Sequence, residues 1–365
     1  MPEDGTTPLL SICIPTYKGA HYLKVTLEAV LPQAAQLGHS VEVVVLDDVS
    51  PDDTPAVAHD AQRHGPLRYL RNETNLGIVK NEVYGVLRHV RGEFVWVWNQ
   101  HCLLHPGALA RVLAVVKQQR HLEALYANFR CARYPEDWPQ AAVGGYAGPY
   151  TCDANADLRN RPVQRWEELL SPASALCTQS QVHIVRRTVW QKYWDGRTAG
   201  PDFSDALTTY PHTCTVAESI FGKPSYYIGE PVITTFMGAQ TWSALGSRSK
   251  LWLRGCPDLL RRYQRLGWPR EKLRPAQAWG SIYAGKVLVD VFQHWAPEHR
   301  QLVFQYVRRY WHYRGVLRSM WKAFLDSQCC GLARAITKTG AALQRWHRYW
   351  FYNCRPARWI RGRKR

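Results

Sequence analysis

Short apolar runs alternate with amphipathic stretches over the first 134 residues, and this alternation constrains the fold more than any other feature. The apolar runs are "LLSICIPTY" at 9–17, "VEVVVLD" at 41–47, "LRYLRN" at 67–72, "GEFVWVWNQ" at 92–100 and "ALYANFRCARY" at 124–134. The stretches between them carry apolar residues at helical spacing. Strands that alternate with crossover helices predict an α/β fold, with a mostly parallel sheet covered by helices on both faces.

Two later segments extend the same pattern. Residues 174–190 predict a further strand and helix, residues 224–236 predict a strand, and a helix between the two segments is closed by Gly222. In the first amphipathic stretch, residues 21–34, we expect Pro32 to end the helix because proline lacks a backbone N–H.

Polar residues follow the apolar runs at the points where the predicted strands end. They form three clusters, which are Pro15-Thr16-Tyr17, Asp47-Asp48 and Asn99-Gln100-His101. In open α/β sheets, ligands bind beyond the carboxyl ends of the strands. The three clusters therefore predict a single binding site at one edge of the sheet.

Four segments in this order resemble one known family. They are "LLSICIPTYKGAHYLKVTLEAVLPQ", "VEVVVLDDVSPDDT", "RNETNLGIVKN" and "GEFVWVWNQHCLLHPGAL". Together they resemble the nucleotide-diphosphosugar-binding half of the family 2 inverting glycosyltransferases, which have the GT-A fold. The resemblance is close over residues 8–125 and loose over 170–240.

The resemblance implies where a sugar-nucleotide donor would bind. In the family, the Pro-Thr-Tyr segment and the acid after the second strand hold the nucleoside, which corresponds to Pro15, Thr16, Tyr17 and Asp47, with Asp48 beside it. A carboxylate can accept the imide N–H of uracil, so a UDP-sugar is the expected donor. The alternative for Asp47 and Asp48 is a turn or helix-capping role, since the segment is rich in capping residues.

"NLGIVKN" corresponds to a further family motif. There Gly77 would let the backbone approach the donor, and Lys80 would face its diphosphate. The alternative is that Lys80 is a solvated helix lysine.

The family carries an Asp-x-Asp where this chain has Asn99-Gln100-His101, so its ribose and metal positions correspond to Asn99 and His101. Neither side chain is acidic. Asn99 can bond a ribose hydroxyl, and the His101 imidazole can ligate a divalent metal such as manganese, with weaker affinity expected for magnesium. Alternatively, no metal is needed, and Lys80 with helix N-termini meets the charge of the diphosphate. A third alternative is an inactive binding or scaffold protein.

An inverting transferase needs a general base to deprotonate the acceptor hydroxyl. The family's register places His212 at this position, with Asp205 and Asp202 as the other candidates. The alternative for His212 is a helix-capping or core histidine, and His183 in a predicted strand is read as structural.

The charge of the chain is concentrated at its C-terminus. Residues 301–365 contain fifteen Lys or Arg and a single acid, Asp326, out of a net charge of +18. Trp and Tyr alternate with these cations, a composition typical of segments that lie on an anionic membrane surface. A core-facing helix pair with a solvated rim is one alternative. Single-stranded nucleic acid is another, but it would leave the four motifs unexplained.

We therefore predict a GT-A domain over residues 1–245 and a helical, basic and aromatic region over 246–365. The GT-A domain comprises a nucleotide-sugar-binding half (8–125) and an acceptor half (126–245) with a loop at 136–165. The expected activity is transfer of a sugar, with inversion, to a hydroxyl of a glycan or lipid-linked acceptor in cell-surface polysaccharide or glycolipid synthesis. Because the N-terminus resembles no signal peptide and no apolar run reaches eighteen residues, a cytoplasmic protein at the inner membrane face is expected.

Overall fold

The computed structural model describes residues 7–135, 137–138, 152–153, 157–239, 245–293, 297–310, 317 and 321. Its strands are β1 (Leu10–Thr16), β2 (Val41–Asp47), β3 (Leu67–Arg71), β4 (Phe94–Val97), β5 (Cys102–Leu104), β6 (Ala124–Arg133), β7 (Cys152–Asp153), β8 (Arg161–Val163), β9 (His183–Arg186) and β10 (Ser225–Met237). Its α-helices are α1 (Ala20–Leu37), α2 (Thr54–Gln62), α3 (Ile78–Arg88), α4 (Ala108–Gln118), α6 (Arg187–Trp194), α7 (Pro211–Ile220), α8 (Leu245–Lys250), α9 (Cys256–Arg265), α10 (Arg270–Gln293) and α11 (Pro297–Tyr310). Short η elements cover Gly38–Ser40, Trp166–Leu169, Ala175–Cys177, Ser180–Val182 and Leu251–Gly255.

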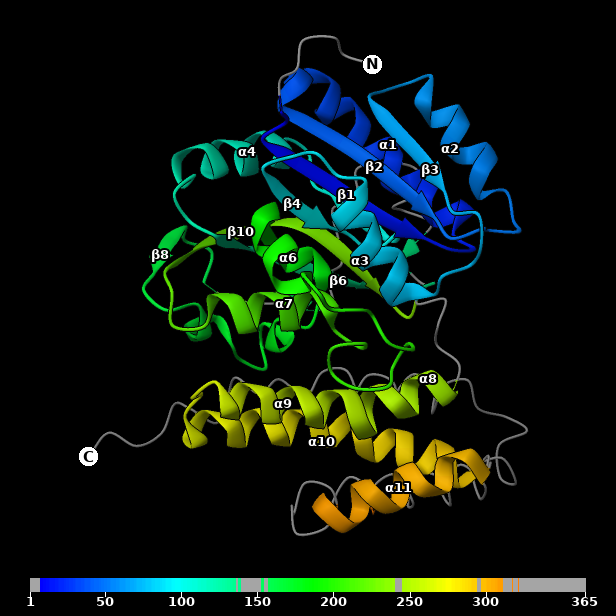
Figure 1. Cartoon of the computed structure of the whole chain (residues 1–365), viewed down its shortest axis with the longest axis vertical. Coiled ribbons are helices and arrows are strands. Elements are labelled where there is room, and N and C mark those ends of the chain that lie inside the picture. Colours follow the sequence, from blue (N-terminus) through cyan, green and yellow to red (C-terminus); the bar gives the residue numbers. More distant parts are fainter. Residues whose placement is uncertain are drawn as a thin grey trace, which may run out of the picture.

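The strands form one sheet in the order β3-β2-β1-β4-β9-β6-β10-β5 (Figure 1). Strands β3, β2, β1 and β4 are parallel, as the alternation of apolar runs and helices predicts. Beyond β4 the pairing is mixed, because β9 runs antiparallel to both β4 and β6, whereas β10 is parallel to β6. The predicted α/β fold is confirmed, and the parallel half of the sheet carries the polar strand ends.

Helices cover both faces of this sheet. Helix α1 contacts both α2 and α4 in one layer, and α6 contacts both α3 and α7 in the other. All seven residues of β2 are buried, which fits a strand covered on both faces. The large aromatic side chains Trp96, Trp98, Trp166 and Trp190 are almost fully buried in the core.

The prediction that Pro32 ends the first helix is wrong, because α1 continues through Pro32 to Leu37. Pro32 lies on the exposed side of the helix. The missing Pro32 N–H would have bonded the carbonyl of Glu28, one turn earlier, and Glu28 is exposed. Water can therefore satisfy this carbonyl, and the helix tolerates the proline.

The C-terminal helices form a separate layer beneath the α/β sheet (Figure 1). Their apolar residues make a small core of their own, which includes Leu253, Leu288 and Tyr306. Among the described residues, none of the helices has the length and apolarity needed to cross a bilayer. Most of the predicted loop 136–165 and nearly all of the tail beyond Tyr310 lie outside the described residues.

Candidate functional site

The ends of β1, β2 and β4 meet at one edge of the sheet. Thr16 pairs in register with Asp47, the last residues of β1 and β2. The Thr16 hydroxyl donates a hydrogen bond to Gln100 Oε1 at 2.5 Å, and the Tyr17 N–H donates to the same oxygen at 3.1 Å. The three polar clusters found in the sequence therefore converge in space.

Gln100 holds this convergence together, and the sequence did not single it out. Its side chain is buried and fills the space beside Gly19, where an added Cβ would lie 2.2 Å from Oε1. Its main-chain carbonyl accepts a hydrogen bond from Thr26 Oγ1 at 2.9 Å. The middle residue of the Asn-Gln-His turn therefore fixes the turn to β1 and α1. No local sequence pattern predicts the contact between Gln100 and the end of β1.

Asp47 is fully buried and braces the loop after β2. Its Oδ1 accepts the Ser50 N–H at 2.9 Å, and its Oδ2 accepts the Tyr69 hydroxyl at 2.7 Å, with Arg71 Nε at 3.7 Å. Burial, followed by the Asp47 hydrogen bond and charge, raises the pKa of Tyr69. These contacts are those expected if Asp47 stabilises the turn. Nucleoside binding by Asp47 stays a prediction.

Asp48 organises the loop that precedes α3. Its Oδ1 accepts hydrogen bonds from Asn72 Nδ2 and the Leu76 N–H, both at 2.8 Å, and its Oδ2 accepts the Gly77 N–H at 2.9 Å. The carboxylate thus draws the "NLG" segment against the end of β2. This contact places two of the four sequence motifs side by side.

Asp202 reaches across to the same loop from the predicted acceptor half. Its two oxygens accept the N–H groups of Ile78 and Val79 at 2.9 and 3.1 Å, which caps the N-terminus of α3. Gly77 has φ of 84°, and a Cβ there would lie 2.7 Å from Asp202 Oδ2. Glycine is therefore required both by the backbone and by the carboxylate. Lys80 lies half-buried in the first turn of this helix.

Asn99 and His101 face different surroundings. Asn99 is half-buried, and its Nδ2 donates to Gln181 Oε1 at 3.1 Å. His101 is buried, with its ring 6.1 Å from that of Tyr22, and its Nδ1 has no hydrogen-bond partner in the structure as described. Burial lowers the pKa of His101 to about 4, so the imidazole is neutral at pH 7.

These donors do not fit a site for a hard divalent cation. Manganese and magnesium prefer several oxygen ligands, usually carboxylates, and this turn offers one buried imidazole and no acid. Within the described ranges, no group of three or more His, Cys, Asp or Glu side chains is placed to hold a metal ion. His101 as a metal ligand stays a prediction, and the arrangement favours chemistry without a metal.

The other two base candidates have internal partners. His212 is buried between Glu82 Oε1, 3.0 Å from Nδ1, and the Thr178 carbonyl, 3.0 Å from Nε2. Asp205 Oδ1 accepts the N–H and hydroxyl of Thr208 in a local turn at 2.8 and 2.9 Å. Asp202 thus contacts the predicted "NLGIVKN" segment itself, whereas His212 contacts Glu82, the residue that follows this segment on α3.

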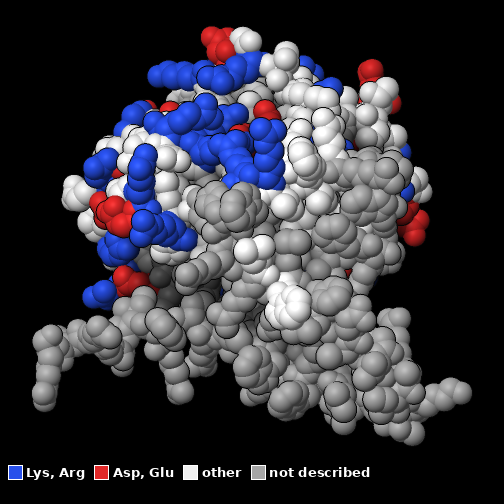
Figure 2. All heavy atoms as spheres, turned by 90° about the horizontal axis from the view of Figure 1, so that it is seen from below, with Lys and Arg blue, Asp and Glu red and all other residues white. Residues whose placement is uncertain are grey.

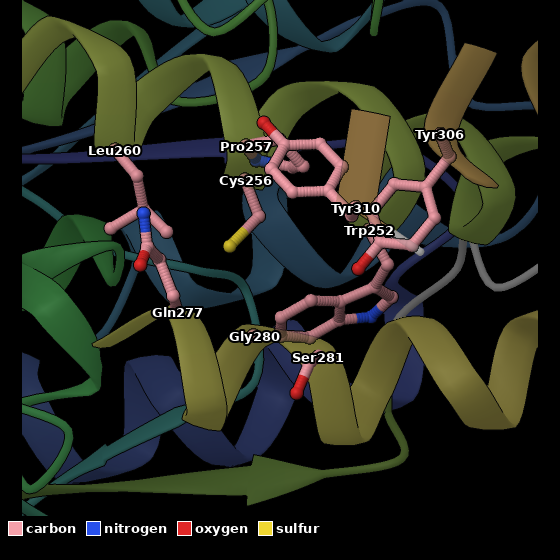
Figure 3. A pocket seen from close by; sticks show the side chains of 9 residues that line it. All are labelled: Trp252, Cys256, Pro257, Leu260, Gln277, Gly280, Ser281, Tyr306 and Tyr310. Carbon is pink, nitrogen blue, oxygen red and sulfur yellow. The ribbon is translucent and has the colours of Figure 1, made fainter. Parts of the chain in front are cut away.

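A pocket between the C-terminal helices lies apart from these strand ends (Figure 3). Its lining is Trp252, Cys256, Pro257, Leu260, Gln277, Gly280, Ser281, Tyr306 and Tyr310. None of these residues is charged, so the lining offers no cation to a diphosphate. The strand-end site remains the candidate for donor binding.

The comparisons with known proteins agree with this geometry. Residues 11–146 match the model of glycosyl transferase family 2. These residues form a glycosyl transferase family 2 domain. The match contains the ends of β1, β2 and β4 and the start of α3, so the motifs and the converging strand ends belong to the same family domain.

Two curated relatives and one solved structure extend the comparison. The chain is 30% identical over 232 residues to abequosyltransferase RfbV from Salmonella typhimurium, covering 62% of this chain and 66% of the relative. It is 38% identical over 102 residues to the uncharacterized protein MT1568 from Mycobacterium tuberculosis, covering 28% and 30%. The chain thus spans less than two thirds of these relatives. The structure of S. aureus TarS 1–349 with UDP-GlcNAc matches with 14% identity and a TM-score of 0.50, covering 82% of this chain and 79% of TarS, which supports the GT-A fold alone.

Proposed function

We propose that this protein transfers a sugar from a nucleoside diphosphate donor to a hydroxyl of a glycan or lipid-linked acceptor, with inversion at the anomeric carbon. The observation that carries the proposal is the convergence of Thr16, Gln100, Asp48 and the N-terminus of α3 at one edge of the sheet. In open α/β sheets this is where a nucleotide binds. The product would be a cell-surface polysaccharide or glycolipid.

The donor would lie across the ends of β1 and β2. Pro15, Thr16 and Tyr17 would contact the nucleoside, with a carboxylate of the Asp47-Asp48 pair beside them. Asn99 would bond the ribose. A UDP-sugar is the preferred donor, because a carboxylate accepts the uracil imide proton. This arrangement is consistent with the fold shared with TarS, whose structure holds UDP-GlcNAc.

The diphosphate would face Gly77, Lys80 and the first amides of α3. A helix N-terminus and a lysine supply positive charge where the leaving group becomes more negative, without a metal ion. Asp202 already holds the amides of Ile78 and Val79. Because two anions compete for these amides, donor binding would displace the Asp202 carboxylate and free it to accept the acceptor proton.

The basic C-terminal region would bring the enzyme to its acceptor. Residues 245–310 contain thirteen Lys or Arg and four Asp or Glu. Seen from the side of the C-terminal helices, Lys and Arg side chains gather on part of the surface and outnumber the Asp and Glu side chains that lie among them (Figure 2). Such a surface favours anionic lipid, so we place the protein on the inner face of the membrane.

Nucleotide binding tests the proposal. The full chain is titrated calorimetrically with UDP, GDP, CDP and dTDP, each with and without manganese. Binding of one diphosphate with the same affinity in both buffers supports the proposal. If none binds, the donor site is refuted. If one binds but the sugar-nucleotide is neither transferred nor hydrolysed, the silent scaffold protein is favoured.

The Asp202 role has its own test. Asp202→Asn should lower the transfer rate by a factor of about 100 to 10,000, the contribution expected of a general base. UDP should bind this variant at least as tightly as the wild type, because the neutral amide competes less well for the α3 amides. His64→Gln, which changes an exposed side chain just beyond the end of α2, is the control. An unchanged rate in Asp202→Asn would remove Asp202 from the mechanism.

A further inference from the structure

A strained turn precedes β9 beside the candidate site. Ala175, Leu176 and Cys177 have φ values of 49°, 55° and 57°, so three successive residues that carry side chains adopt the left-handed conformation. Side chains disfavour this conformation, and it persists where the surroundings impose it. Strained turns of this kind cluster at functional sites, and they are held by contacts from the surrounding structure.

Four side-chain donors hold the carbonyl groups of this turn. The Tyr263 hydroxyl of α9 donates to the Leu176 carbonyl at 2.8 Å. His183 Nε2 and the Thr213 hydroxyl each lie 2.8 Å from the Cys177 carbonyl. His212 Nε2 lies 3.0 Å from the Thr178 carbonyl. The turn is thus fixed from α7, α9 and β9 together.

His212 differs from the other donors because it also contacts the donor-binding helix. Its Nδ1 lies 3.0 Å from Glu82 Oε1 on α3, and both side chains are less than 10% exposed. A carbonyl and a carboxylate oxygen accept but cannot donate, so the ring satisfies both only as a doubly protonated imidazolium. Burial lowers the pKa of His212, while the charge and hydrogen bond of Glu82 and then the Thr178 carbonyl raise it, with a net upward shift.

The segment after the turn carries amide side chains to the strand ends. Gln181 Oε1 accepts the hydrogen bond of Asn99 Nδ2, and Gln181 Nε2 donates to Gln179 Oε1 at 3.4 Å. The Trp96 indole donates to the Gln181 carbonyl at 2.6 Å. The position of Asn99 therefore depends on where the strained turn places Gln181.

We propose that His212 is a positioning residue whose imidazolium ties α3 to the turn at 175–178 and thereby aligns Lys80 and Asn99 on the donor. The inference rests on the proposed function. It assigns His212 a role other than that of the general base, since neither ring nitrogen has a free lone pair to accept a proton. The ring faces Glu82 from α3 and the neutral His183 from β9, at a ring distance of 6.0 Å.

UDP affinity distinguishes the two roles without knowledge of the acceptor. A general base acts on the acceptor hydroxyl, so its substitution leaves UDP binding unchanged. Substitution of a positioning residue weakens UDP binding. His212→Gln keeps a donor for the Thr178 carbonyl but turns its amide oxygen toward Glu82, so we expect UDP affinity to fall by a factor of about 10 to 100, as for other supporting residues.

A paired change supplies the rescue. When Glu82→Gln is combined with His212→Gln, the new amide on α3 can donate to the new side-chain oxygen on α7. The amide nitrogen on α7 still donates to the Thr178 carbonyl, which restores the link with no titratable group. We expect UDP affinity within about threefold of wild type.

His64→Gln is the matched control for this pair, and thermal melting confirms that each variant is folded. A single His212→Gln variant that binds UDP like wild type would overturn the inference. So would a double variant that binds as weakly as the single one.

One readout is independent of nucleotide binding. The His212 imidazole, observed by NMR, should remain doubly protonated at pH 7 in the wild-type chain. It should become neutral at pH 7 in Glu82→Gln. If wild-type His212 is neutral at pH 7, the inference fails even where UDP binds. If the ring is doubly protonated but no nucleoside diphosphate binds, the proposed function fails and the link between α3 and the turn stands.

Discussion

Gly77→Ala tests the junction between α3 and Asp202 directly. Gly77 has φ of 84° and ψ of 166°, a region open almost only to glycine, and forcing alanine into it costs on the order of 1–3 kcal/mol. The new Cβ would lie 2.7 Å from Asp202 Oδ2 and would displace the carboxylate. Loss of a helix cap costs about 0.5–2 kcal/mol more. The free energy of unfolding should therefore fall by about 2–4 kcal/mol.

Urea denaturation of four proteins separates the two contributions. The wild type, Gly77→Ala, Asp202→Ala and the double variant form a cycle, in which the double variant should lose less than the sum of the singles because the cap is lost only once. Gly222→Ala is the backbone control, since Gly222 has φ of 79° and a Cβ there would meet nothing within 4 Å. If Gly77→Ala costs no more than Gly222→Ala, or if the cycle is additive, Asp202 does not cap α3.

Three further results are expected. Burial, then the charge of His212, lowers the pKa of His183 to about 3. Between pH 6.5 and pH 3 the unfolded chain therefore binds a proton at His183 that the folded chain does not, so the free energy of unfolding falls as pH falls below 6.5. His183→Gln should then reduce the loss of unfolding free energy between pH 7 and pH 5 by about 2 kcal/mol, measured by urea denaturation. Gln100→Ala removes the acceptor of two hydrogen bonds and should cost about 2–4 kcal/mol and abolish UDP binding, whereas Gln118→Ala, at an exposed position, should do neither. The full chain should sediment with phosphatidylglycerol vesicles and not with phosphatidylcholine vesicles, and be released in molar salt; equal sedimentation with both would contradict an anionic surface.

The parts of the fold that depend on local pattern could be predicted from the sequence. The runs ending at Thr16, Asp47 and Arg71 are strands, and their carboxyl ends meet at one edge as parallel pairing requires. Local rules failed at Pro32, because the carbonyl that loses its donor belongs to the exposed Glu28 and can bond water. The fate of a proline depends on which face of the helix it occupies, and sequence spacing alone does not settle this.

The sequence predicts where the candidate site lies but not the side-chain contacts that hold it together. The clusters at 15–17, 47–48 and 99–101 lie together, yet the roles of Gln100 and Gln181 arise from partners more than 80 residues away in the sequence. The strained turn at 175–177 contains no glycine, so its left-handed backbone could not be predicted from residue type. Such features follow from tertiary contacts, which a single sequence does not display.

The packing of His101 limits how this turn can be re-engineered. Restoring acids at both ends of the Asn-Gln-His turn is an obvious way to install metal dependence, but the two positions are not equivalent. An aspartate for Asn99 needs a rotation of the Gln181 amide, which then presents its nitrogen and gives up the long bond to Gln179. An aspartate for His101 would be enclosed beside Tyr22, whose neighbours are Trp138 and Phe236. A metal-dependent version of this enzyme would have to be built by enlarging that aromatic enclosure first.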